Sequence, residues 1–349
     1  MPVSRSARRL TPVLLVMTLI VSSAVAQAKQ PPPPCETVLG KVFIPNPVAT
    51  TGDNTLRDRK DSDQAVLNAE RVTVKLTGLD GSGYLRGRWA VVVSETGDPA
   101  YETDCTYFYT RRDDRFEQVM AYWWVTKSQQ YLRSLGFGTG AFPAVNADRQ
   151  RVRINQWGID NSFATTHPRD EMRFGKGGVD DAEDGDVILH ELGHQIHFSQ
   201  SDTFFSSAEA GAISEGFGDY WAFTVSKKVM AQFGLGPQFD EACIAKWDAT
   251  SYDSNPANGI CLRRIDQDLT YPDDLVGQVH ADGRIWSRAL YDLHHAIGQV
   301  RADTAVLAAQ FGWTGTTMPH LAKRIVARAE ALYGQGDEAE AVFEERGIL

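Results

Sequence analysis

Two histidines and a glutamate near the middle of the chain stand at a spacing that suits a metal ion. Residues 190–194 read HELGH, an instance of the HExxH pattern. In a helix, His190 and His194 lie on one face, where both imidazoles can bind one zinc ion. Glu191 then lies beside the metal without ligating it and can take a proton from a zinc-bound water. With only three fixed residues, the pattern also occurs by chance in helices that carry two surface or core histidines.

A third ligand follows at a workable distance. Enough chain separates His194 from Glu215 for one helix to end, a loop to turn and a second helix to begin. Glu215 would complete a His, His, Glu set and leave the fourth zinc position open for water. Asp219 lies on the same helical face, where its carboxylate can accept the remaining N–H of a ligand histidine. A Glu/Asp pair is usually a solvated helix face, but the run 217–223 is otherwise mostly apolar, which favours a site.

The pattern of zinc peptidases with a third histidine ligand is absent. That pattern needs glycine seven and histidine ten residues after the first histidine, and those positions hold His197 and Gln200. We therefore expect His197 to pack between helices rather than to bind the metal.

A further histidine lies downstream, in the segment GQVHADGRIW (277–286). His280 stands just before an expected helix and can point into a cleft from a second lobe. An imidazole N–H there would stabilise the oxyanion that forms when water attacks a peptide carbonyl. An ordinary loop histidine is the alternative, and spacing alone leaves both interpretations open.

Several segments together resemble the fungalysin-type zinc metallopeptidases, which are gluzincins and more distantly similar to the thermolysin group. These segments are DNSF (160–163), GGVDDAEDGDVILHELGHQIH (177–197), SEGFGDYWA (214–222) and VHADGRIWSRALYDL (279–293). Residues 42–52 and 116–138 also resemble the fungalysin catalytic region. The resemblance therefore runs across most of the chain that follows its N-terminal leader.

The resemblance implies a role for each matching residue around the metal. His190, His194 and Glu215 would hold one catalytic Zn²⁺ ion. Glu191 would be the general base, and Asp219 would be the carboxylate partner of His190.

The resemblance implies two further roles, and the chain departs from the thermolysin group in two places. By resemblance, His280 would stabilise the tetrahedral intermediate, and Asn161, in a turn after an edge strand, would hydrogen-bond the substrate backbone. The thermolysin group has asparagine before the glutamate ligand; this chain has Ser214, to which we assign no role. Phe204 and Phe205 occupy the positions nearest to a transition-state tyrosine, and neither can donate a hydrogen bond.

An acidic segment stands just before the HELGH helix, with residues Asp180, Asp181, Glu183, Asp184 and Asp186. Such charges are favoured near a helix N-terminus by the helix dipole. A Ca²⁺ site is the alternative. Apart from Asp186, the calcium ligands of the thermolysin group do not line up as a set, so calcium stays an open alternative.

The implied fold is α+β, a thermolysin-like zincin with the HELGH helix between two lobes. Residues 36–200 form the strand-rich N-terminal lobe, which ends in that helix, and residues 201–349 form a mostly helical C-terminal lobe. Alternating apolar residues predict strands. These are 72–76, 88–93 and 151–155. Helical periodicity is expected over 116–135, 183–199, 214–233, 283–298, 300–311 and 319–334.

The first residues have the pattern of a secretory signal peptide. Arg5, Arg8 and Arg9 precede an apolar run, and small residues end at Ala26, where we expect cleavage. The signal peptide would thus span 1–26, followed by a proline-rich spacer over 27–35. We expect a secreted or periplasmic protein without a membrane anchor.

Four cysteines suggest disulfides in an exported protein. We favour the pairs Cys35–Cys105 and Cys243–Cys261, because each pair stays within one predicted lobe. Zinc binding by these thiols is the weaker alternative, since no CxxC spacing exists.

The net charge of −10 and the pI of about 5.3 argue against nucleic acid and anionic membranes as partners. We expect a monomer that acts on polypeptide substrates, and the predicted function is a secreted zinc endopeptidase. A zinc aminopeptidase is one alternative, although no motif for holding a free α-amine is recognisable. A secreted zinc-stabilised binding module with weak or no catalysis is another.

Overall fold

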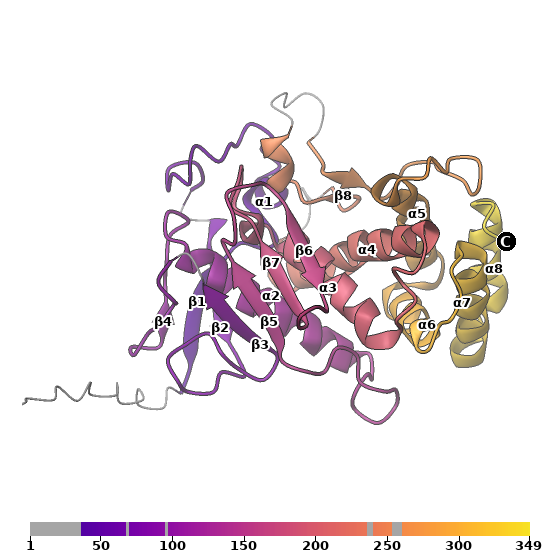
Figure 1. Cartoon of the computed structure of the whole chain (residues 1–349), viewed down its shortest axis with the longest axis horizontal. Coiled ribbons are helices and arrows are strands. Elements are labelled where there is room, and N and C mark those ends of the chain that lie inside the picture. Colours follow the sequence, from indigo (N-terminus) through magenta and orange to yellow (C-terminus); the bar gives the residue numbers. More distant parts are fainter. Residues whose placement is uncertain (1–35, 68–69, 95–96, 236–239, 253–259) are drawn as a thin grey trace, which may run out of the picture. The chain divides into compact units, whose positions relative to one another are not determined.

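The computed structural model describes residues 36–67, 70–94, 97–235, 240–252 and 260–349 (Figure 1). The predicted signal peptide (1–26), the spacer (27–35) and Cys35 lie outside these residues. Within the described ranges, no helix is both long enough and apolar enough to cross a membrane.

Strands dominate the first half of the described chain. A three-stranded sheet has β1 at its centre, antiparallel to β2 and parallel to β4. A four-stranded sheet has the order β3-β5-β7-β6, with β6 antiparallel to β7 at one edge. The strands are β1 (Val38–Val42), β2 (Val72–Leu76), β3 (Ala90–Ser94), β4 (Thr106–Tyr107), β5 (Gln150–Ile154), β6 (Ser162–Thr165) and β7 (Glu171–Phe174).

The edge strand predicted before Asn161 is not found there: the edge strand is β6, which begins directly after Asn161. The alternating segment that suggested a strand is β5, which lies inside the sheet between β3 and β7. Val152 of β5 is buried, whereas Arg151 and Arg153 are half-buried and form ion pairs with Glu171 of β7. Because a neighbouring strand supplies that carboxylate, the arginines do not mark an exposed edge.

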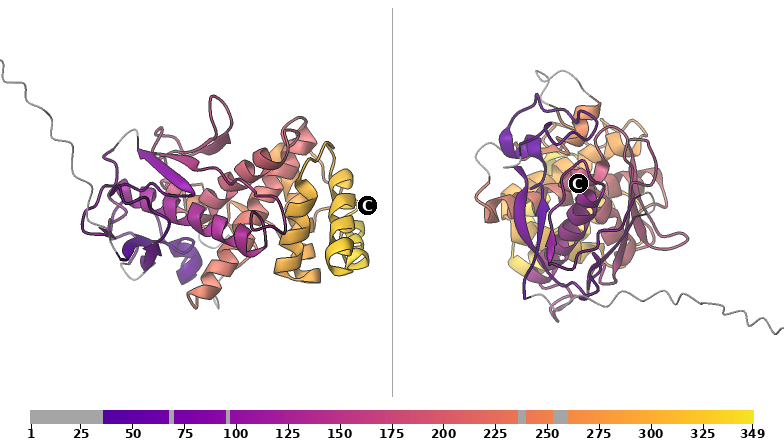
Figure 2. Two further views of the ribbon diagram at one scale, coloured as in Figure 1. Left: turned by 90° about the horizontal axis from the view of Figure 1, so that it is seen from below. Right: turned by 90° about the vertical axis from the view of Figure 1, so that its left-hand side faces the viewer.

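Two helices lie among these strands in sequence, and the others follow β7. α1 (Pro47–Thr51) is short, and α2 (Arg115–Ser134) packs against both larger sheets and against α3 (Gly185–Gln200), the HELGH helix. The remaining helices are α4 (Ala208–Gln232), α5 (Val279–Ile297), α6 (Gln299–Gln310), α7 (Met318–Tyr333) and α8 (Gly336–Glu345). In Figure 2, α7 and α8, coloured yellow, lie at the end of the described chain away from the strands. The α+β class and the helical C-terminal part agree with the prediction.

Two helices begin earlier than predicted, and two, the short α1 and α8, were not predicted. Ser207 caps α4, since its hydroxyl accepts from the backbone N–H of Ala210 at 3.1 Å. Gln278 caps α5 in the same way through Ala281. α8 has a short amphipathic pattern directly after the left-handed Gly334 that ends α7, and tertiary burial of its apolar face stabilises it.

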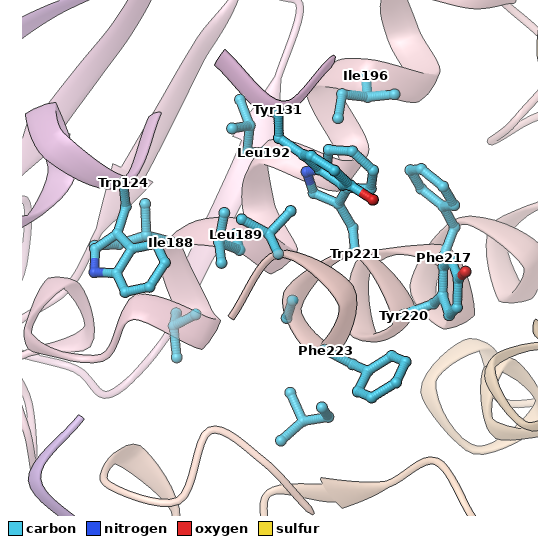
Figure 3. Packing of buried hydrophobic residues seen from close by; sticks show 14 of the residues in the cluster. Trp124, Tyr131, Ile188, Leu189, Leu192, Ile196, Phe217, Tyr220, Trp221 and Phe223 are labelled. Atoms are coloured by element: carbon cyan, nitrogen blue, oxygen red, sulfur yellow. The ribbon is translucent and has the colours of Figure 1, made fainter. Parts of the chain in front are cut away.

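The core between α2, α3 and α4 is built from aromatic and branched side chains (Figure 3). Ile188 lies beside Trp124, and Tyr131 stacks over Trp221 with ring centroids 5.8 Å apart. Trp221 also donates its indole N–H to the Ser128 hydroxyl at 2.9 Å. The α2 aromatics are therefore core residues.

Glycines allow α3, α4 and α5 to approach one another closely. A methyl group added at Gly193 of α3 would lie 2.8 Å from Cα of Gly218 on α4. One added at Gly216 would lie 2.2 Å from the carbonyl oxygen of Gly283 on α5. These contacts leave no room for a side chain, so the three helices that carry the predicted site residues are held at backbone contact distance.

A two-stranded hairpin of β8 (Cys243–Ile244) and β9 (Arg263–Arg264) lies beside α4. The predicted Cys243–Cys261 disulfide is present, with a Cα–Cα distance of 5.3 Å. Cys105 is disulfide-bonded as well. Its predicted partner, Cys35, lies outside the described residues.

Candidate metal centre

The three predicted zinc ligands meet in one place. Nε2 of His190 lies 3.3 Å from one carboxylate oxygen of Glu215, and Nε2 of His194 lies 3.6 Å from the other. All three side chains are buried, and one ligand atom from each lies within 4.8 Å of the other two. In a tetrahedral zinc site with bonds of roughly 2.1 Å, ligand atoms are about 3.4 Å apart. The donor set and its spacing therefore suit zinc.

Helix geometry and glycine contacts bring these ligands together. α3 presents His190 and His194 one turn apart, with ring centroids separated by 4.8 Å. Glu215 comes from α4, which crosses α3 at the Gly193–Gly218 contact. A methyl group at Gly218 would also lie 2.7 Å from Nδ1 of His190. Glycine at this position therefore lets the imidazole lie against α4.

Asp219 occupies the position predicted for a partner of His190, since its Oδ1 lies 2.9 Å from Nδ1 of that ring. Arg263 of β9 donates to both Asp219 oxygens from Nε, at 2.7 and 2.9 Å. Burial and Arg263 act to lower the pKa of His190, but the hydrogen bonds that its ring donates to Asp219 and Glu215 outweigh them and raise it to about 10. Both carboxylates thus stabilise positive charge at this ring, whether from a proton or from a metal.

Arg263 was not predicted from the sequence. It stands in a loop-rich region where only the nearby Cys261 attracts notice, and no spacing relates it to the HELGH segment. Its position next to Asp219 depends on the β8–β9 hairpin, which the disulfide closes.

Ser214, to which we assigned no role, contacts two histidines. Its hydroxyl oxygen lies 2.9 Å from Nδ1 of His194 and 3.0 Å from Nδ1 of His197. A histidine that binds metal through Nε2 keeps its proton on Nδ1. His194 would then donate to the Ser214 hydroxyl, which in turn donates to His197. The residue before Glu215 could have suggested this role, because asparagine occupies that place in the thermolysin group.

His197 packs in the core, as expected. Its ring stacks on Phe204 and Phe217 at centroid distances of 3.6 and 4.3 Å, and burial holds its pKa well below the ordinary value. A neutral ring in this place is suited to accept the Ser214 proton.

Glu191 is buried and lines a pocket together with His190, His280 and Asn161. Within the described chain, its Oε2 has no hydrogen-bond partner. Burial raises the pKa of Glu191 to about 7. A carboxylate with a free oxygen and such a pKa can both accept and return a proton near neutral pH.

His280 lies in the first turn of α5, not before the helix as predicted. Its Nε2 lies 3.5 Å from Oε2 of Glu215, and about half of its side chain is exposed. The carbonyl oxygen of the Gln278 side chain accepts from Ala281 N, which orients the amide so that its Nε2 faces Nδ1 of His280 at 2.8 Å. In a neutral His280, this donation leaves the ring proton on Nε2, toward the site.

Asn161 lies at the rim of the same pocket with an exposed side chain. Its backbone carbonyl accepts from Gly175 N at 3.2 Å, which secures the turn before β6. The side-chain amide therefore stands beside β6, the strand at the edge of its sheet.

Three carboxylates that we did not predict as a group also line this pocket. One oxygen each of Asp160, Asp181 and Asp248 lies within 4.8 Å of the other two. Among the residues described, Oδ1 of Asp181 and Oδ1 of Asp248 are buried without a hydrogen-bond partner. Burial raises the pKa of Asp181 to about 8 and that of Asp248 well above its usual range. A positively charged group in the pocket would restore the charged form of these acids.

The end of the acidic segment serves α3 itself. Asp184 is its N-cap residue, and its side chain accepts from Asp186 N and Trp247 N, each at 3.0 Å. Asp186 accepts from the Ser226 hydroxyl at 2.6 Å and from Ala245 N at 3.1 Å. Protein donors thus occupy Asp184 and Asp186, which agrees with the helix-terminus interpretation and disfavours Asp186 as a calcium ligand.

Comparison with known proteins adds no family assignment. No protein-family model and no curated protein matches the chain. The side-chain geometry of the site is therefore the basis for a functional proposal, and the fungalysin resemblance stays a prediction.

Proposed function

We propose that this chain is an exported zinc-dependent endopeptidase of the thermolysin-like zincin type. The observation that carries the proposal is the buried Glu191 carboxylate, whose Oε2 has no hydrogen-bond partner among the described residues, beside the His190, His194 and Glu215 ligand set. A ligand set alone would suit a structural metal. A buried carboxylate oxygen without a hydrogen-bond donor destabilises the fold, and a catalytic role for Glu191 explains why it stands in this pocket.

Zinc would be held by two imidazoles and one carboxylate, a set that leaves one position open. When bound there, zinc would lower the pKa of water and polarise the carbonyl of the substrate. Asp219 and Ser214 would hold the His190 and His194 rings by their Nδ1 atoms, and Arg263 would hold Asp219.

Glu191 would act as general base. It takes one proton from the attacking water, the remaining hydroxide forms the bond to the carbonyl carbon, and the same proton passes to the leaving amine as the C–N bond breaks. His280 would donate its Nε2–H to the carbonyl oxygen while negative charge develops there. No tyrosine is assigned a role in this proposal, because Phe204 and Phe205, at the positions nearest to a transition-state tyrosine, lack a hydroxyl.

The substrate would bind as an extra strand along β6. That strand is at the edge of its sheet, and Asn161 precedes it on the pocket rim. Main-chain pairing of this kind binds an extended peptide with little regard to its side chains. Such binding suits an endopeptidase.

Two observations support the wider proposal. The order of a mostly parallel sheet with an antiparallel edge strand, then the HELGH helix, then a helical part supports the thermolysin-like architecture. The Cys243–Cys261 disulfide supports export, because disulfides persist in oxidising compartments.

An aminopeptidase is the second candidate, and a specific observation favours it. Such an enzyme needs acidic groups that hold a free α-amine, and Asp160, Asp181 and Asp248 line the pocket that contains Glu191. Comparing cleavage of one peptide with a free and with an acetylated N-terminus separates the candidates. An endopeptidase cleaves both, whereas an aminopeptidase cleaves only the free form.

The test of the proposal is digestion of unfolded casein by the zinc-loaded chain and its Glu191→Gln variant. We expect the variant to keep its zinc and to lose roughly 10²–10⁴-fold in rate, the usual contribution of a general base. Glu340→Gln, at an exposed glutamate of α8, is the matched control and should keep full activity. Full activity in Glu191→Gln would contradict the proposal. Zinc bound by an inactive wild-type chain would favour the binding-module alternative.

A further inference from the structure

A second group of carboxylates lies at the start of α2, separate from the zinc ligand set. One oxygen each of Asp114, Glu117 and Asp180 lies within 4.8 Å of the other two. Asp114 is the N-cap residue of α2, and Glu117 lies in its first turn. Asp180 precedes η2 (Asp181–Glu183), the short turn that leads into α3. The group therefore joins the start of one core helix to the entry of another.

Glu117 is the member that points to a ligand. Its side chain is 0 % exposed, and in the described part of the chain neither of its carboxylate oxygens has a hydrogen-bond partner. Asp180 is 4 % exposed, and its Oδ1 also has no hydrogen-bond partner among the described residues. A buried carboxylate without donors is strongly unfavourable unless it binds a proton or a cation.

The side chain of Asp114 also faces the cluster and does not cap its own helix. Aspartate is among the preferred N-cap residues because its side chain can accept a backbone N–H of the first turn. Asp114 makes no such bond, although it stands at the N-cap position. One of its oxygens instead lies with Glu117 and Asp180.

The surrounding charges do not neutralise this group. Arg111 donates to Glu183 at 2.6 Å and to Asp58 at 2.5 Å, so its guanidinium is engaged by other carboxylates. Burial, with Glu183 and Asp61 nearby, raises the pKa of Asp180 to about 9. The negative charge at the cluster therefore exceeds what the neighbouring side chains balance.

We propose that Asp114, Glu117 and Asp180 bind one calcium ion. Calcium takes carboxylate oxygens at about 2.3–2.6 Å, so oxygens on opposite sides of the ion are about 5 Å apart. Oxygens that all lie within 4.8 Å of one another can thus share one ion. An all-oxygen set disfavours zinc, and calcium accepts irregular coordination by carboxylates more readily than magnesium, which demands near-ideal octahedral geometry.

The bound ion would join α2 to the segment that enters α3. Since α3 carries His190, His194 and Glu191, calcium would stabilise the helix of the candidate metal centre without touching it. Calcium binding at this site can be tested without the proposed peptidase activity, because it is measured through thermal stability.

The test is a thermal melt of the zinc-loaded chain with and without added calcium. At a calcium concentration about 100-fold above the dissociation constant, we expect Tm to rise by about 5 °C. Glu117→Gln should abolish this rise. Without calcium, the variant should melt no lower than wild type, because glutamine removes a buried charge. Metal analysis after gel filtration should find calcium in wild type at one ion per chain, and none at this site in the variant.

Two controls make the result specific. Asp303→Asn changes a buried acid of α6 that receives hydroxyl donors, and it should keep the calcium response. Asp160→Asn alters the pocket carboxylates and should keep it too. The proposal is overturned if Glu117→Gln retains the full shift, or if wild type neither shifts nor binds calcium. It is also overturned if only Asp160→Asn loses the response, which would assign the ion to the pocket.

Discussion

The side-chain amide of Gln278 donates to Nδ1 of His280 across 2.8 Å, while its carbonyl oxygen caps α5 through Ala281 N. One side chain thus begins a helix and orients the imidazole in its first turn. Because the capping bond determines which end of the amide faces the ring, a neutral His280 keeps its proton on Nε2, toward Glu215. The helix start therefore prepares His280 as a hydrogen-bond donor.

Replacing Gln278 by serine separates the capping of α5 from the orientation of the His280 ring. Serine is a good N-cap residue, so α5 and Tm should be unchanged, while the donor to Nδ1 is lost. We expect kcat to fall by about fivefold to tenfold with little change in KM, the effect of one hydrogen bond of about 1 kcal/mol. In a His280→Ala background the same substitution should cost nothing more. An equal loss in both backgrounds would show that Gln278 does not act through His280.

Ser214→Ala should weaken zinc binding. The substitution removes the acceptor for Nδ1–H of His194, and loss of such a partner typically lowers metal affinity by about 10–100-fold. Competition with a chromophoric chelator measures the affinity. Ser226→Ala is the matched control, because Ser226 lies on the same helix but contacts Asp186. Equal affinities in both variants would mean that the contact between Ser214 and His194 has no part in metal binding.

Asp181→Asn should reduce any preference for substrates with a positive charge. Among the described residues, Oδ1 of Asp181 and Oδ1 of Asp248 have no hydrogen-bond partner, and both acids line the pocket that contains Glu191, so a cationic group is favoured there. We expect wild type to cleave lysine-containing peptides with a higher kcat/KM than matched methionine peptides. In the variant, the ratio of these two kcat/KM values should be about tenfold lower. Asp170→Asn, at an exposed position, should leave the ratio unchanged. Equal cleavage of both peptides by wild type would contradict this prediction.

Asp303 should make stability depend on pH. Burial raises its pKa to about 6, against hydrogen bonds from Tyr131, Tyr220 and Thr224. Unfolded, its pKa is about 3.9. The folded protein thus holds the proton more tightly, and stability falls as pH rises from about 4 to about 6, by up to about 3 kcal/mol, then stays level.

The Asp303→Asn side chain does not titrate, so this variant should lack the fall in the free energy of unfolding that Asp303 causes as the pH rises. Urea unfolding across that pH range should show the variant gaining stability relative to wild type, whatever the offset at low pH. Asp148→Asn, at an exposed aspartate, is the control and should run parallel to wild type. Parallel curves for Asp303→Asn would mean that this carboxylate is ionised in both states.

Local spacing predicted much of the site because helices convert spacing into shared faces. His190 with His194 and Glu215 with Asp219 each lie on one helix, so their pairing needs only the helical repeat. The α+β class follows from alternating and helical patterns in the same way.

Contacts between distant segments could not be predicted. Arg263 reaches Asp219 only because a hairpin folds over α4, and the grouping of Glu117 with Asp180 depends on how α2 packs against the entry to α3. The edge position of β6 likewise depends on strand order, which alternation does not encode.

The glycine contacts between helices have a consequence for recognising related chains. Gly193 stands between the two histidine ligands and Gly218 between Glu215 and Asp219, and the two glycines touch each other in space. A chain with the same histidines and carboxylates but a branched residue at either glycine would hold α3 and α4 farther apart and would not bring its ligands to one point. A search pattern for this type of centre should therefore include the spacers, as His-Glu-x-Gly-His followed by Glu-Gly-x-Gly-Asp, since the apparently silent positions decide whether the ligands meet.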